Sequence, residues 1–222
     1  NMNNFTVCNN RNLSAFFGQK RITSLPERMK SFTPPGKFML LALLCLLITG
    51  NVAGQTRVQT ATGNNGTDTP SKYISLAMGS DTKTGNTLIA VISTRGKAIN
   101  MVSGVSGGGA TWIKAVESIN NSGNTTEIWY SSNISIATKN IVITLSGISP
   151  GQEQLPFDGI QHILTASPLD QTAYATGNSK DAITGISPLT TQANELWIGG
   201  IGFSNSTYSL SNISNSFKLV TT

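Results

Sequence analysis

The sequence predicts an all-β fold, a two-sheet antiparallel β-sandwich of the Ig-like or jelly-roll-like kind, on three observations. From Lys72 onward, short runs of β-branched and aromatic residues alternate with clusters of Gly, Asn, Ser and Pro, which is typical of sandwiches and barrels. No segment of this region keeps a helical hydrophobic period over ten residues. Ile141, Ile143 and Leu145 recur at every second position and share one face, while Val142 and Thr144 take the other, as in a strand with one buried face.

Ten short strands are expected in this region, and segment 87–92 is apolar at successive positions, which favours a central strand buried on both faces. The breaks between strands contain the Gly, Asn and Pro residues that tight turns require. The clearest breaks are at 104–109, 120–124, 146–152 and 177–180. The expected strands are 73–77, 87–93, 98–102, 111–117, 126–131, 140–145, 159–164, 171–176, 195–203 and 217–220.

The first 54 residues are predicted to be removed on export. A signal peptide is expected at 29–54, because Lys30 and Lys37 precede an uninterrupted apolar run at 38–48 and small residues follow it. Cleavage is expected near Ala53 or Gly54. The apolar run has 11 residues, whereas a membrane-spanning helix needs roughly 20, so no stable membrane span is expected after cleavage. Residues 1–28 are interpreted as an upstream or non-structural segment.

Removal of this leader changes the charge and the chemistry of the chain. The formal net charge of +5 comes from the leader, because nine of the 15 basic and nine of the 10 acidic residues lie after residue 54. The remaining basic residues are scattered, so nucleic acid is not an expected partner. Cys8 and Cys45 both lie in the leader, which excludes disulfides and cysteine metal sites from the exported part. Segment 55–71 is polar and is expected to be a flexible linker, followed by the domain at 72–222.

Catalytic machinery is not evident in the sequence. The single histidine, His162, lies in an expected strand without a nucleophile motif, so a structural role is favoured and neither zinc nor a cofactor is expected. Glu127 and Glu195 each precede a tryptophan by two residues, so each acid shares a strand face with an aromatic ring. A glycosidase acid pair therefore stays open as an alternative. Asp81 is a weak calcium candidate, and an Asx-type turn is favoured there.

Aromatic residues supply the candidate ligand-binding set, because sugar rings stack on aromatic side chains whose polar tips form hydrogen bonds. The alternative is that these rings belong to the core of the sandwich. The candidates are Trp129, Tyr130, Trp197 and Tyr208.

The order of several motifs after Lys72 resembles a group of secreted bacterial β-sandwich modules that repeat in large extracellular and surface proteins. The resemblance implies structural positions for Trp112 and Trp129 and no catalytic residues. Its pattern continues for about two further strands beyond 217–220, which implies a domain truncated at its C-terminal end with an unpaired sheet edge. The motifs lie at 85–91, 109–112, 126–130, 167–173 and 192–199.

Together these features predict a non-catalytic secreted or cell-surface module with a structural or adhesive role. Its expected partners are a glycan, a cell-surface polymer or neighbouring modules of a larger surface protein. Two alternatives stay open: a secreted carbohydrate-active enzyme or its accessory binding domain, and an extracellular subunit that self-assembles by strand addition.

Overall fold

The structure is a computed structural model, and it describes the chain in separate stretches. Backbone alone is described at 2–9, 14–20, 155–161 and 218–220. Backbone and side chains are described at 56–63, 71–95, 99–109, 111–120, 123–147, 168–179, 182–191, 195–203, 211, 213 and 217.

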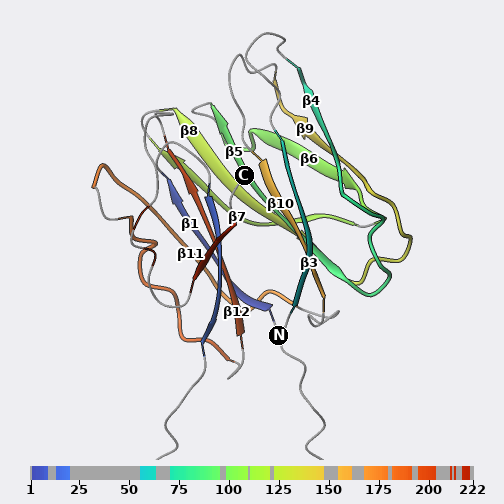
Figure 1. Ribbon diagram of the computed structural model, residues 1–222. Coiled ribbons are helices and arrows are strands. Elements are labelled where there is room, and N and C mark those ends of the chain that lie inside the picture. The colour runs from blue at the N-terminus through green and yellow to red at the C-terminus, as the bar shows by residue number, and fades with distance from the viewer. Residues whose placement is uncertain are drawn as a thin grey trace, which may run out of the picture.

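Every element of the described chain is a strand, and the strands form three sheets (Figure 1). Sheet B has the order β3 (Thr56–Gly63), β10 (Leu155–Gln161), β5 (Thr87–Arg95), β8 (Asn124–Ser131) and β7 (Ile113–Asn120). Sheet C has the order β4 (Tyr73–Ala77), β9 (Asn140–Leu145) and β6 (Val102–Gly107). Sheet A has the order β11 (Thr172–Thr176), β1 (Met2–Asn9), β12 (Glu195–Gly202), β2 (Ser14–Lys20) and β13 (Lys218–Val220).

The predicted all-β class is confirmed, while the number and type of sheets differ from the prediction. The described chain has three sheets where two were expected. Sheets B and C are antiparallel as predicted, but sheet A is mixed, because β1 runs parallel to both β11 and β12. The extra pairings come from residues 1–28, in which no strand was expected. No helix in the described stretches is long and apolar enough to cross a membrane.

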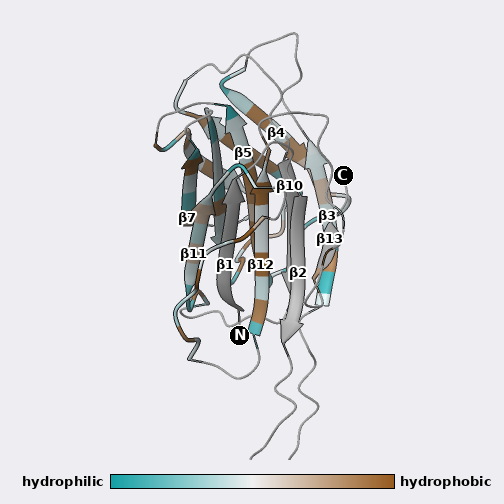
Figure 2. Ribbon diagram, turned by 90° about the vertical axis from the view of Figure 1, so that its left-hand side faces the viewer, coloured by the Kyte–Doolittle hydropathy of each residue, from teal (hydrophilic) through white to brown (hydrophobic). Residues whose placement is uncertain are grey.

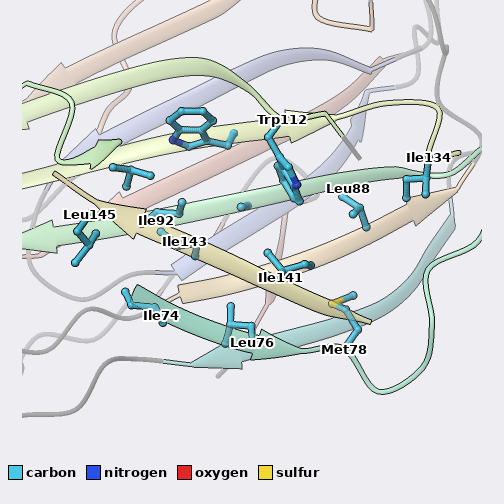
Figure 3. Close-up of a cluster of buried hydrophobic side chains, with 13 residues drawn as sticks. Ile74, Leu76, Met78, Leu88, Ile92, Trp112, Ile134, Ile141, Ile143 and Leu145 are labelled. Carbon is cyan, nitrogen blue, oxygen red and sulfur yellow. The ribbon is translucent and has the colours of Figure 1, made fainter. Parts of the chain in front are cut away.

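Strand β5 forms the centre of the molecule because both of its faces are buried. Leu88 and Ile92 point into a cluster shared with sheet C, and Ile89 and Val91 point into a second cluster shared with β12. Figure 3 shows the first cluster, in which Leu88 and Ile92 lie near side chains from β4 and β9. The continuous apolar run at 87–92 is the sequence counterpart of this double burial.

Sheet A packs on the face of sheet B opposite to sheet C. Leu196 and Ile198 of β12 share the second cluster with Ile128 and Tyr130 of β8. Figure 2 shows β12 in the middle of sheet A, with hydrophobic residues along its length. Sheet B therefore lies between the two hydrophobic clusters.

Several segments differ from their predicted local structure; for example, β10 begins at Leu155, whereas the strand was predicted at 159–164. Thr56–Gly63, expected in the flexible linker, forms edge strand β3 and pairs antiparallel with β10; its alternating Thr and Val residues suit an edge strand despite their polar surroundings. The expected turn at 104–109 is strand β6 as far as Gly107, and the turn follows at Gly108 and Gly109; all three glycines have positive φ. β6 begins at Val102, whereas a strand was predicted at 98–102.

Gly200 allows β12 to approach sheet B closely. A β-carbon at this position would collide with Cγ1 of Val91 and would lie 3.7 Å from Cγ2 of Thr126. We predict that Gly200→Val lowers the free energy of unfolding by about 1–3 kcal/mol, because overpacking forces side chains or backbone to move. Urea denaturation measures the effect. Gly147→Val is the matched control, since nothing lies within 4 Å of a β-carbon there; equal losses in both variants would contradict the close approach.

Candidate functional site: a buried carboxylate and a lysine between sheets B and C

Glu127 is a fully buried carboxylate in the middle of β8, with a side chain that is 0% exposed. It shares the β8 face of Trp129, which belongs to the cluster between sheets B and C. The register places Glu127 opposite Ile92 of β5 on one side and opposite Glu117 of β7 on the other. A charge at such a position needs partners, because burial of an unpaired charge is costly.

Three donors surround the Glu127 carboxylate. Oε1 accepts a hydrogen bond from the backbone N–H of Val102 at 2.9 Å. Oε2 accepts one from Nε1 of Trp129 at 2.9 Å and lies 3.0 Å from Nζ of Lys114. Since Val102 begins β6 and Lys114 lies on β7, this single carboxylate connects sheets B and C.

A β-bulge brings Lys114 to this face of sheet B. Lys114 and Glu117 are three residues apart, so in a regular strand their side chains would point to opposite faces. The register shifts between Lys114 and Val116, which leaves Ala115 as the extra residue. Lys114 therefore pairs with Trp129, Glu117 pairs with Glu127, and all four side chains share one face.

The Lys114 ammonium lies among three oxygen atoms. Nζ donates to Oε2 of Glu117 at 2.9 Å and to Oδ1 of Asn100 at 2.7 Å, in addition to its contact with Glu127. It also lies 5.4 Å from the centroid of the Trp129 ring, within the range of a cation–π interaction. The Lys114 side chain is 20% exposed, so this is a mostly buried charge with a complete set of partners.

Asn100 is held in a defined position beside the lysine. Its backbone N–H donates to Oε1 of Glu117 at 2.6 Å. Its φ of 56° is in the left-handed region, which asparagine enters more readily than most residues. The two oxygens of Glu117 thus hold the backbone of Asn100 and the amine of Lys114 at the same time.

The pKa values of the central pair reflect burial and pairing. Burial raises the pKa of Glu127 above its ordinary value of 4.5, against the opposing effect of its three donors. Because all three partners donate, the site holds the carboxylate and not the acid at neutral pH. Burial lowers the pKa of Lys114, but the hydrogen bonds and charges of Glu117 and Glu127 outweigh it, so the pKa lies above 10.5.

This pairing predicts a stability change at alkaline pH. The folded pKa of Lys114 exceeds 10.5, so its stabilisation is fully present below that pH and is lost as the pH rises through the folded value. Urea denaturation of the Asn100→Ala variant and of the same variant with Lys114→Met, from about pH 8 to about pH 12, should show a difference in unfolding free energy that is constant at first and shrinks at the highest pH values. Burial raises the pKa of Tyr130, but Tyr130 is present in both chains, so its titration does not change the difference between their unfolding free energies. A difference that stays constant throughout would contradict the assignment.

The predicted aromatic ligand set does not form one surface. Trp129 and Tyr130 lie on opposite faces of β8, and each belongs to a different hydrophobic cluster. Trp197 lies on β12, is half-buried, and its Nε1 has no hydrogen-bond partner within the described residues. Tyr208 lies outside the described residues.

The other candidates are also separate from one another. β12, which carries Glu195, packs on the face of sheet B opposite to the one that carries Glu127, so these two acids do not form a pair. Asp81 is exposed, and the described stretches contain no group of three or more potential metal ligands. His162 and the signal segment at 29–54 lie outside the described residues.

Sequence reasoning singled out Glu127 and Trp129, missed Lys114 and Asn100, and did not connect Glu117 with them. The spacing of Glu127 and Trp129 correctly placed them on one strand face, and Nε1 of Trp129 donates to Glu127. The bulge between Lys114 and Val116 that brings these residues together has no counterpart in the local sequence pattern.

Comparison of the chain with protein-family models, with curated proteins and with solved structures finds no match. The resemblance to secreted bacterial β-sandwich modules stays a prediction. The geometry of the described residues and the chemistry of the sequence are therefore the basis for assigning a function.

Proposed function

We propose that the chain is exported and serves as a non-catalytic β-sandwich module outside the cell, with a structural or adhesive role. The observation that carries this proposal is the full engagement of Glu127, whose two oxygens bind Val102, Trp129 and Lys114. A carboxylate used in this way joins sheets and has no free oxygen for a substrate. The face-to-face packing of sheets through two hydrophobic clusters supports the sandwich architecture.

The enzyme alternative needs two carboxylates about 5–9.5 Å apart in a cleft. Glu127 and Glu195 lie on opposite sides of sheet B. Glu117 lies beside Glu127, but Lys114 sits between their carboxylates and bonds to both. This geometry favours the non-catalytic function.

Export is tested by producing the full chain in a bacterial host and locating it. The proposal expects a product outside the cytoplasm whose N-terminus, read by sequencing, lies near Ala53 or Gly54. A lysine-free n-region, made by Lys30→Gln and Lys37→Gln, should lower the exported fraction. An intracellular product that keeps residues 1–54 would contradict export.

Adhesion is tested by retention on arrays of glycans and cell-surface polymers. Of the three tryptophans, Trp197 is the one that is only half-buried. If an aromatic face binds the ligand, Trp197→Ala should therefore lower the amount of protein retained on the array. Trp112→Phe is the control, because Trp112 is 9% exposed and its Nε1 donates to the carbonyl of Gly107. Retention that is unchanged in Trp197→Ala would exclude this residue as the contact.

Self-assembly by strand addition is favoured by one observation in sheet A. β12 makes its backbone ladders with β1 and β2, and both strands precede the expected cleavage site. A processed chain would have two open edges on β12, and open edges accept strands from other chains. Light scattering should then show oligomers of the processed form and monomers of the uncleaved chain; monomers of both would exclude strand addition.

A further inference from the structure

Lys114 and Asn100 place a largely buried amine against the carboxamide of an exposed residue. Nζ of Lys114 lies 2.7 Å from Oδ1 of Asn100, and that oxygen is one C=O bond, about 1.23 Å, from the carbonyl carbon. Four interactions hold the two groups in place: both oxygens of Glu117, Oε2 of Glu127 and the Trp129 ring. A positioned pair of this kind reacts far faster than the same groups free in water.

We propose that Lys114 and Asn100 form an intramolecular isopeptide bond, so that this cluster is a site of covalent self-modification. In the reaction, Nζ of Lys114 bonds to Cγ of Asn100, and the bond between Cγ and Nδ2 breaks. The ammonium group and the carboxamide give one secondary amide and one ammonium ion, so atoms and charge balance. No oxidant or other reactant is needed.

Glu127 is the proton acceptor in this step. The ammonium must lose a proton before its nitrogen can attack, and Oε2 of Glu127 is 3.0 Å away. Burial raises the pKa of Glu127, which favours temporary uptake of that proton and its delivery to the departing Nδ2. Glu117 is a positioning residue, because it holds the backbone N–H of Asn100 and the Lys114 amine.

The bond would close a covalent loop between two sheets. Lys114 lies on β7 of sheet B, and Asn100 lies two residues before β6 of sheet C. The ionic contact that now joins these elements would be replaced by a bond that does not dissociate. A chain without cysteine after residue 54 has no disulfide to do this, so an amide cross-link would suit an extracellular structural module.

Mass spectrometry of the purified full chain tests the proposal. Cross-linked protein is lighter than its sequence by about 17 Da, the mass of one ammonia. Trypsin would not cleave after Lys114, so peptide 98–139 should replace peptides 98–114 and 115–139, with the same loss of mass. An unmodified mass after prolonged incubation at neutral pH would overturn the proposal, and so would a gain of about 1 Da from hydrolysis of the Asn100 amide.

Variants separate the chemistry from folding. Asn100→Ala and Lys114→Arg should abolish the mass loss, whereas Asn133→Ala, at the other described asparagine with positive φ, should not. Glu127→Gln should abolish it while Glu117→Gln, which keeps an acceptor oxygen, should not; the reverse pattern would overturn the role of Glu127. Circular dichroism confirms that each variant is folded. Failure of the cross-link would leave export and polymer binding unaffected, so the two proposals can fail separately.

Discussion

Lys114→Met is expected to lower the free energy of unfolding by about 3–5 kcal/mol, because it leaves the buried charge of Glu127 without its counter-ion. The Glu127 side chain is 0% exposed, so water cannot replace the lost ammonium. Urea denaturation at neutral pH is the measurement. It is made in the Asn100→Ala background, which removes any contribution from the proposed cross-link.

Two further variants make this result specific. The double variant Lys114→Met with Glu127→Leu should recover most of the loss, because an apolar pair can replace a buried ion pair at little cost. Lys139→Met should change stability by less than about 0.5 kcal/mol, since Lys139 is exposed. If the double variant is less stable than Lys114→Met alone, Glu127 stabilises the fold chiefly through Val102 and Trp129.

Ile128→Ala is expected to cost roughly 2–5 kcal/mol, the usual range for removing a large aliphatic side chain from a packed core. Ile128 is 0% exposed and belongs to the cluster that joins β8 to β12. Ile113→Ala on the neighbouring strand β7 is the control, because Ile113 is 51% exposed. Thermal and urea unfolding compare the two. Similar losses in both variants would show that sheet A does not pack on this face of β8.

Local pattern was sufficient to predict most of the strands. The strands at 73–77 and 140–145 match β4 and β9 in both bounds, because alternating apolar residues show directly which face is buried. The apolar run at 87–92 correctly indicated a strand buried on both faces. Composition was misleading at Thr56–Gly63, where polar residues form an edge strand.

The arrangement of sheets and the charge cluster depend on contacts between distant residues. Strand alternation places Lys114 and Glu117 on opposite faces, and only the bulge in the β7 to β8 register brings them together. The contact of Glu127 with Val102 depends on how sheet C packs on sheet B. Neither the bulge nor the packing of layers leaves a periodic signal in the sequence, so only Glu127 and Trp129 could be associated in advance.

The pairing of β1 with β12 has a consequence for the order of folding. Met2 pairs with Leu196, so sheet A cannot be completed until nearly the whole chain has been synthesised. The strands of sheets B and C all lie between Thr56 and Gln161, and shorter loops close at lower entropic cost. Sheets B and C should therefore form a partly folded intermediate first. In this intermediate the hydrophobic face of sheet B stays exposed until β12 packs on it.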